Sequence, residues 1–388
     1  MLSWPVHMIY NVFISTLPVC PFTGNVRRQR PMGPTRKTTR VSDKSEPQLP
    51  GTAGQKSAKP TLRTIAVMTG LAVTTVSRAL SDAPQISAKT RKLVQEVAAE
   101  IGYLPDRAAQ RLKTGRTNVI SVLLDPHEEI LDFATSLMHG LARALQPTPY
   151  HIIVTPNFLD GANVEAVNYI LRNRMADGLI LSRTEPFDPR VRLLLESGLP
   201  FVTHGRTEFS TPHPHVDYDN FAFAMEAGNR LIAKGRRKLM ILLPPKRLTF
   251  FQHMLYGFMT AVRESGVEYE IPDEIDLDSP VDKIHDFMRR RATLPDLPDG
   301  FICPGEVSAL ATITGMTDNG LTLGREYDMV AKQTSRLLGH IQPKIDFIYE
   351  DLSAAGEQMG KFLLARIDGA PPGSLQDLQP PQFSIPDA

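Results

Sequence analysis

The chain has 388 residues and a formal net charge of +1, with 43 Lys or Arg against 42 Asp or Glu. Two cysteines, Cys20 and Cys303, are too few for a disulfide framework and are typical of a reducing cytoplasm. No convincing membrane span is present, because apolar runs are short and are interrupted by polar residues and prolines. These features exclude a disulfide-rich secreted domain and an integral membrane protein.

The first 59 residues do not follow the pattern of a folded domain. Residues 2–22 lean apolar but contain several prolines and lack a basic leader, so they make a poor signal peptide. Residues 23–60 are rich in Arg, Lys, Pro, Thr, Ser and Gly, a composition typical of disorder. Two interpretations stay open: a genuine basic arm, or a misassigned start with the true one downstream, for example at Met32.

Residues 61–117 predict a small helical unit followed by a short hinge. Thr61 precedes an apolar-periodic run and is a candidate N-cap, and Gly70 can supply the left-handed turn between two crossed helices. A second helix is predicted over 74–80, with Val76 and Leu80 four residues apart and facing the core. Ser87 is expected to cap a third helix whose apolar face holds Val94, Val97 and Ile101. The pattern fits a helix-turn-helix, and on periodicity alone it fits a plain three-helix surface domain equally well.

The outward face of the second predicted helix carries small hydroxyls and one arginine. Thr74, Thr75, Ser77 and Arg78 are residue types that reach phosphates and base edges in a major groove. The charge agrees: residues 61–117 hold nine Lys or Arg and four acids, and no acid interrupts the hinge from Arg107 to Arg116. A local basic face on a nearly neutral chain indicates contact with DNA phosphates.

Three short motifs in this segment add to the pattern. TVSRAL, ISAKTRKLV and IGYLPDRAAQRLKTGRT follow one another in order and without a gap. This run resembles the LacI/GalR family of transcription repressors. The resemblance implies a helix-turn-helix head over 60–105, a hinge helix over 106–117 and an effector-binding domain over 118–388, with 1–59 as the extension described above.

The resemblance also implies roles for particular residues of the head and hinge. Leu112 matches the hinge leucine that wedges into the minor groove and bends the duplex. Ala108 is small enough to let two hinge helices approach, and Asn118 matches a backbone-contacting or capping position. The full set of expected DNA contacts is Val73, Thr74, Thr75, Ser77, Arg78, Arg107, Ala109 and Leu112.

Two positions depart from the family pattern. Ala72 stands where the recognition helix usually opens with Ser, which removes a cap worth about 1 kcal/mol. Asp106 stands where the hinge usually opens with Asn. Aspartate is a good cap, but it brings a negative charge near the DNA phosphates. Both departures bear on DNA affinity rather than on the class of protein.

After the hinge, short apolar runs alternate with helical patterns. This alternation predicts parallel sheets covered by helices on both faces, and the number of strands requires two sheets. The expected strands are 119–125, 151–157, 178–182, 200–205, 238–244, 300–305 and 327–333. The expected helices are 131–145, 164–174, 191–196, 221–233, 254–264, 309–318 and 352–367.

The resemblance gives this domain the architecture of a periplasmic binding protein, with two doubly wound α/β subdomains and a ligand cleft between them. MADGLIL (175–181) and the segment 216–245 are similar to family segments. The chain is expected to cross between the subdomains near Tyr218, Phe347 and Gly373. Since ligands in open α/β sheets bind at the carboxyl ends of strands, effector contacts are expected there.

The sequence departs from sugar-binding relatives at those strand ends. Met254 stands where an Arg is usual, Gly305 and Glu306 replace an Asn-Asp pair, and a further Asp is missing after 327–333. We expect a rearranged set of polar residues to hold a polar effector, most simply a carbohydrate. The alternative is that these are surface residues, or that Lys332 only pairs with a carboxylate. The expected effector contacts are Asp219, Gln252, His253, Glu306, Lys332 and Gln333.

Other classes of protein fit less well. The sequence contains no GxxxxGK[ST] loop, GxGxxG run, CxxC pair or GxSxG elbow. Two clusters hold metal-ligand residue types, His213 with His215 and Asp217, and residues 125–129, but both fall in expected loops without rigid spacing. We therefore expect no enzyme, no cofactor and no metal. A nucleoid-like nonspecific binder would not need the large second domain.

The sequence thus predicts a cytoplasmic regulator, most simply a repressor, whose partners are double-stranded operator DNA and a small-molecule effector. The resemblance implies a homodimer on a palindromic operator. The tail after Pro371 shows no apolar heptad for tetramer formation, which favours a dimer over a tetramer. Two alternatives stay open: a periplasmic-type sugar-binding protein, and a regulator that responds to a metabolite other than a sugar.

Overall fold

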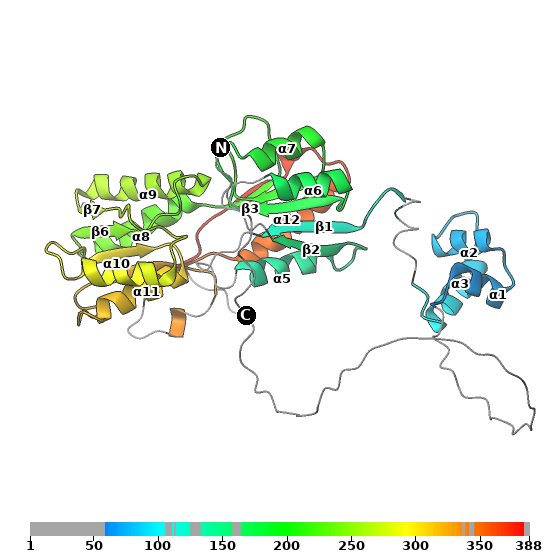
Figure 1. Cartoon of the computed structure of the whole chain (residues 1–388), viewed down its shortest axis with the longest axis horizontal. Coiled ribbons are helices and arrows are strands. Elements are labelled where there is room, and N and C mark those ends of the chain that lie inside the picture. Colours follow the sequence, from blue (N-terminus) through cyan, green and yellow to red (C-terminus); the bar gives the residue numbers. More distant parts are fainter. Residues whose placement is uncertain are drawn as a thin grey trace, which may run out of the picture. The chain divides into compact units, whose positions relative to one another are not determined.

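A computed structural model describes residues 59–104, 111, 114–124, 133–156, 164–335, 338–340 and 345–383 (Figure 1). Three helices form the head: α1 (Leu62–Thr69), α2 (Val73–Leu80) and α3 (Ala88–Glu100). The side chain of Thr61 accepts a hydrogen bond from the Thr64 N–H, and Gly70 ends α1 at a φ of 68°. The head has its own small core of fully or nearly fully buried side chains: Ile65, Ala66, Val76, Ala79, Val94 and Ala98.

The first sheet of the large domain is parallel and has six strands in the order β11-β5-β4-β3-β1-β2. Its central strand β3 is buried along its whole length, as expected for a strand covered on both faces. The strands are β1 (Val119–Leu124), β2 (His151–Pro156), β3 (Gly178–Ser182), β4 (Phe201–His204), β5 (His215–Tyr218) and β11 (Gln376–Gln379).

The second sheet is also parallel and has five strands in the order β10-β9-β8-β6-β7. Its strands are β6 (Lys238–Ile241), β7 (Glu268–Glu270), β8 (Gly300–Cys303), β9 (Asp328–Gln333) and β10 (Asp346–Tyr349). The central strand β8 and its neighbour β9 supply buried side chains to the clusters on both faces of the sheet.

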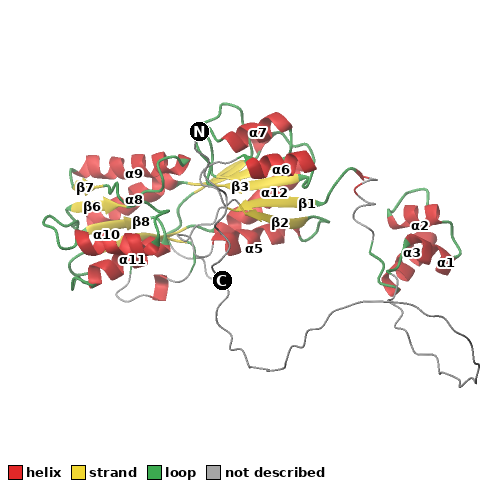
Figure 2. Ribbon diagram, in the orientation of Figure 1, coloured by secondary structure: helices red, strands yellow, loops and turns green. Residues whose placement is uncertain are grey.

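Helices cover both faces of each sheet, as the yellow strands between red helices in Figure 2 show. On the first sheet, α5 (Phe133–Leu145) and α12 (Leu352–Ile367) share one apolar cluster, and α6 (Glu165–Asn173) and α7 (Pro189–Ser197) share the other. On the second sheet, α8 (Asn220–Ala233) pairs with α9 (Thr249–Ser265), and α10 (Val281–Arg291) pairs with α11 (Glu306–Thr317). The expected architecture of two doubly wound parallel sheets is confirmed.

Glycine permits the close approach of α5 and α12. A Cβ atom on Gly140 would overlap the carbonyl oxygen of Ser353, and one on Gly356 would overlap the carbonyl oxygen of Leu137. Backbone cannot move aside as a flexible side chain can, so these two positions require glycine. The α5–α12 contact also matters for connectivity, because α12 follows the second sheet in sequence yet packs on the first.

The chain leaves the first sheet after β5 and returns to it after β10 through α12. A crossing near Gly373 is wrong: Gly373 lies in the short 3-10 helix η2 (Pro372–Ser374), between α12 and β11, which both belong to the first half. The next link between the halves follows β11, where Gln382 exchanges backbone hydrogen bonds with Tyr349 at the end of β10.

Five elements of the large domain were not expected from the sequence: β5, β7, α10, β10 and β11. His215 and Asp217 were expected in a loop but lie on β5. The remaining 3-10 helix, η1, spans Leu338–His340. Among the described residues, no helix combines the length and apolarity needed to cross a membrane, and no group of three or more His, Cys, Asp and Glu could hold a metal ion.

Candidate functional site

The second helix of the head presents an exposed polar face. Thr74 and Arg78 are exposed, Val73 is 41% exposed, and Thr75 and Ser77 are half-buried. On the opposite face Val76 is fully buried and Leu80 packs against the head core, as the four-residue spacing predicts. Arg78 therefore projects from a helix whose other side is fixed by packing, which suits a side chain that must meet a base edge in a set position.

The start of α2 is less well supported than the starts of its neighbours. Ala72 occupies the N-cap position and offers no side-chain hydrogen bond, whereas Thr61 and Ser87 cap α1 and α3. The hinge contacts Arg107, Ala109 and Leu112 lie outside the described residues. Arg111 is described, and its guanidinium donates to the carbonyl oxygens of Asn173 and Arg174 at the end of α6. Asn118 lies directly before β1, where its N–H donates to Asp177.

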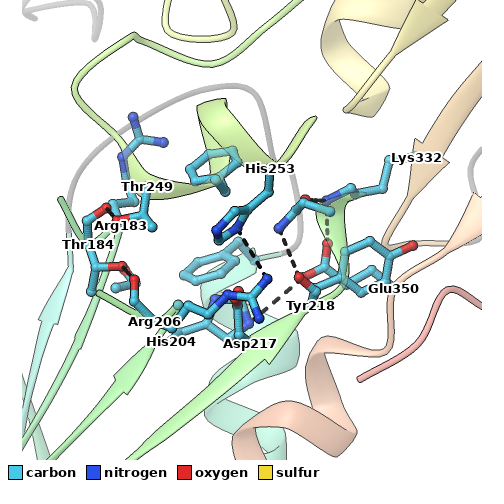
Figure 3. A pocket seen from close by; sticks show the side chains of 15 residues that line it. Arg183, Thr184, His204, Arg206, Asp217, Tyr218, Thr249, His253, Lys332 and Glu350 are labelled. Atoms are coloured by element: carbon cyan, nitrogen blue, oxygen red, sulfur yellow. Dashed lines mark hydrogen bonds and ion pairs between the residues drawn. The ribbon is translucent and has the colours of Figure 1, made fainter. Parts of the chain in front are cut away.

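A cavity with about 590 Å³ of empty space, part of it open to solvent, lies where the carboxyl ends of strands from both sheets meet (Figure 3). The first half contributes residues that follow β3 and β4, and the second half contributes residues from α9 and β9. The lining residues are Phe133, Ser182, Arg183, Thr184, His204, Gly205, Arg206, Asp217, Tyr218, Asn220, Thr249, Phe250, His253, Lys332 and Glu350.

Lys332 is the most enclosed cation of the cavity, with only 6% of the residue exposed. Its Nζ lies 3.0 Å from Oε2 of Glu350 and donates to Oδ1 of Asn220 at 2.8 Å. The same ammonium lies 4.2 Å from the ring centroid of Tyr218, a cation–π contact. Lys332 thus lines the cavity and also pairs with a carboxylate.

Arg206 joins the two halves at the floor of the cavity (Figure 3). Its Nε lies 3.1 Å from Oδ2 of Asp217, and its Nη2 lies 3.4 Å from Nδ1 of His253 on α9. An arginine can only donate, so the His253 Nδ1 accepts. Burial raises the pKa of Asp217 to about 6, against the opposing effect of Arg206, so Asp217 is ionised at neutral pH.

The histidines around the cavity are neutral at physiological pH. Burial, followed by the charge of Arg206, lowers the pKa of His253 to about 4. Burial also lowers the pKa of His204, whose ring packs edge-on against Phe133. These rings therefore offer one donor and one acceptor each rather than a positive charge.

The rim of the cavity is bridged by direct contacts between the two halves. Thr249, at the start of α9, donates its N–H and its hydroxyl to the carbonyl oxygen of Thr184, at 2.9 and 3.0 Å. Arg183 donates Nη2 to both carboxylate oxygens of Asp278. Arg247, from the second half, lies 3.5 Å from Asp278 and 3.5 Å from Glu185 of the first half. The rim is thus a chain of alternating charges.

A buried ion pair holds Arg183 in place. The guanidinium of Arg190 is 1% exposed, pairs with Asp188 at 2.7 Å and donates to the carbonyl oxygens of Ser182 and Arg183. Arg183 itself has a φ of 56°, which is uncommon for a residue other than glycine. The Arg190 bonds fix this strained turn and so direct Arg183 across the rim.

Two of the six expected effector residues, His253 and Lys332, line the cavity, and four do not. Asp219 caps α8 by accepting from the Ala222 N–H, and Gln252 points to solvent on α9. Glu306 is 1% exposed and accepts hydrogen bonds from Thr334 and Ser335, so it organises the turn after β9 instead. Gln333 is fully buried at the end of β9.

Sequence reasoning missed most of the cavity residues in the first half. The rule that ligands bind at strand ends predicted the place, but the expected residues were chosen only from the second half. The same rule applied to the strands 178–182 and 200–205 would have found Arg183, Thr184 and Arg206. Glu350 and Asp217 needed β10 and β5, which the sequence did not indicate. Met254, where the resemblance implies an Arg, is fully buried in the core between α8 and α9.

Two family models match the chain. Residues 61–106 match bacterial regulatory proteins of the lacI family, and residues 119–330 match the periplasmic binding proteins and sugar binding domain of the LacI family. Among curated relatives, the HTH-type transcriptional regulator CelR of Thermobifida fusca is 26% identical over 325 residues, which is 81% of this chain and 94% of that protein.

Solved structures show the same fold at low sequence identity. The Lac repressor dimer bound to operator and the anti-inducer ONPF aligns with a TM-score of 0.72 and 19% identity, covering 84% of this chain and 97% of that one. A complex of the transcriptional regulator CelR with cellobiose aligns with a TM-score of 0.60 and 23% identity, covering 84% and 99%.

Proposed function

The chain belongs to the LacI family of bacterial regulatory proteins, and on that premise we propose that it is a repressor that binds a palindromic operator as a homodimer. Its proposed parts are the head over 60–105, the hinge over 106–117 and the effector domain over 118–388. A protein of this kind works where the chromosome is, in the cytoplasm. The relatives matched are transcriptional regulators, which favours this function over an enzyme.

The head reads DNA through α2 in this proposal. The exposed face of Thr74 and Arg78, with Val73 beside them, enters the major groove, while half-buried Thr75 and Ser77 contact the backbone. Arg107, Ala109 and Leu112 act in the hinge, with Leu112 as the wedge between central base pairs. Two heads related by a two-fold axis then require a palindromic site.

The effector binds in the cavity between the two sheets and is most simply a carbohydrate. The supporting observation is the cavity itself: carboxylates, amide and hydroxyl groups stand beside the rings of Phe133, Tyr218 and Phe250. Sugars present hydroxyls at their edges and apolar C–H faces, so this mixture suits them. The CelR complex with cellobiose, a structure of the same fold, has a sugar as its ligand.

The cross-cleft contacts supply the coupling between effector and DNA. Arg206–His253, Thr249–Thr184 and the Arg183–Asp278 rim each join the two halves, so their making and breaking follows the angle between the sheets. A ligand that binds one inter-sheet angle more tightly than another shifts the equilibrium between the two conformations. By linkage, the ligand changes the affinity for DNA by the same factor by which DNA changes the affinity for the ligand.

The test is binding of the purified protein to tiled upstream DNA of its own and neighbouring genes, at about 150 mM salt, with and without a panel of sugars. We expect one short protected palindrome that one sugar either releases or causes the protein to bind more tightly. Binding that is uniform along the DNA would overturn sequence-specific repression. Protection that no sugar changes but another metabolite does would support the DNA-binding regulator and contradict the carbohydrate effector. A metabolite other than a sugar is the second candidate effector class.

A further inference from the structure

Every cation of the effector cavity already has a carboxylate partner within the protein. Lys332 pairs with Glu350 at 3.0 Å, and Arg206 pairs with Asp217 at 3.1 Å. Arg183 pairs with Asp278 at the rim. The two imidazole rings of the lining, His204 and His253, have lowered pKa values and are neutral. The lining therefore carries three positive and two negative charges, and the third carboxylate, Asp278, pairs with Arg183 from the rim.

Burial makes these pairs strong enough to matter for recognition. Lys332 and Glu350 are 7% and 6% exposed, and Asp217 is 6% exposed. An anionic ligand would lose its hydration on entry and would find Asp217 and Glu350 beside the cations that could receive it. An uncharged ligand loses far less hydration and can use the outer lone pairs and N–H groups of the same pairs.

We propose that Asp217 and Glu350 act as internal counter-ions that make the cavity select uncharged sugars and reject their acidic or phosphorylated counterparts. The proposal rests on the proposed function, because it presumes that this cavity receives the effector. Asp217 is the specificity-determining residue of the two, since Arg206 is 31% exposed and is the cation that a ligand can reach. Lys332 is shielded further by Asn220 and Tyr218.

Asp217→Asn tests the proposal, because asparagine keeps the shape of the side chain but leaves the Arg206 charge uncompensated. The neutral probes are cellobiose, glucose and galactose, and the anionic probes are glucuronate, galacturonate and the 6-phosphates of glucose and galactose. Calorimetric titration is done on the full-length wild type and the variant. We expect the variant to bind at least one anionic probe about tenfold or more tightly than the wild type does.

Asp377→Asn is the matched control. Asp377 lies on the neighbouring strand β11, opposite Val216 in register, and does not line the cavity. It loses the same charge and should gain no affinity for any anionic probe. Glu350→Gln, which unpairs Lys332, is the second variant if Asp217→Asn fails to fold, as judged by circular dichroism; a gain for anionic probes is again expected.

The outcomes separate this proposal from the function it rests on. No gain in anion affinity in either folded variant, or an equal gain in Asp377→Asn, overturns the counter-ion role. An anionic probe that binds the wild type and releases operator also overturns it while leaving the regulator intact. If Asp217→Asn gains affinity for an anionic probe but no neutral sugar binds the wild type, the counter-ion role is supported and the carbohydrate effector is contradicted.

Discussion

The head and the effector cavity are built from sequence in opposite ways. The head places its proposed DNA-reading face and its core within about 40 residues, α1 and α3 carry side-chain caps, and apolar spacings of three or four fix all three helices. The cavity joins residues that are far apart in the chain: Lys332 bonds Asn220, 112 positions away, and Arg183 bonds Asp278, 95 positions away. A site of the first kind is carried by a local motif, whereas a site of the second kind depends on the whole fold.

The largest expected effect, a loss of stability confined to the effector domain, comes from a substitution in the helices that support the cavity. Gly140→Ala places a Cβ against the Ser353 backbone where α5 meets α12, so we expect the effector domain to lose about 3 kcal/mol of unfolding free energy. Hydrogen exchange measured by mass spectrometry should rise in peptides of α5 and α12 but not in α1 to α3. Gly373→Ala is the control, because its Cβ would meet Pro212 at an ordinary 3.7 Å. Equal exchange in both variants would contradict the close approach.

Arg78→Ala should produce the converse effect, confined to the head. Removing a base-reading arginine costs about 1–3 kcal/mol on the operator and relaxes base choice at one position. Fluorescence anisotropy on the operator and on random DNA measures both, and sugar affinity should not change. Arg290→Ala removes the same charge from an exposed site on α10 and should leave operator affinity unchanged. If Arg78→Ala weakens random DNA equally, Arg78 contacts only phosphate.

The contrast also explains what the sequence could predict. The head and the strands with apolar runs, such as β1 and β3, carry their signal in their own residues, and these elements were found within a few residues of their observed bounds. The strands β5 (HVDY) and β11 (QDLQ) were missed because their residues are largely polar and their pairing is set by neighbours in the sheet. The helix α10 was missed because only Ile284, Phe287 and Met288 of it are buried, among many charges.

The same reasoning applies to the cavity. Lys332 was predicted because it stands near the end of an expected strand, and His253 because it neighbours Met254, where the resemblance implies an Arg. Asp217 and Glu350 were not, because a single carboxylate in a sequence looks like a surface residue until its partner is known. Their pairing with Arg206 and Lys332 is a property of the assembled halves. Charge compensation of this kind has no local sequence signal.

The rim contacts allow a smaller test of long-range assembly. A double-mutant cycle with Arg183→Ala and Asp278→Asn should give a coupling of about 1 kcal/mol in unfolding free energy, measured by urea titration. Their side chains are 12% and 26% exposed. The exposed pair Lys246–Asp273, with side chains 77% and 83% exposed at 3.0 Å, is the matched control and should show almost no coupling. If the coupling energy at the rim is no greater than in the control pair, the Arg183–Asp278 contact does not help to join the two halves.

The smallest expected effect returns to the head. Helices α1 and α3 begin with Thr61 and Ser87 as hydrogen-bonding caps, whereas α2 begins with Ala72, whose backbone is extended but whose side chain offers no oxygen. Ala72→Ser supplies that oxygen in a backbone already suited to it, so the head should gain about 0.5–1 kcal/mol of stability. Thermal unfolding of wild type and variant measures the gain, with Ala72→Val as the control, because valine offers no oxygen and is as poor an N-cap as alanine. A gain in stability with unchanged operator affinity would mean that α2 is fully formed before it meets DNA. A gain in both stability and operator affinity would mean that folding of the first turn of α2 is coupled to DNA binding. If neither stability nor operator affinity rises, the N–H groups of this turn are already satisfied without a cap.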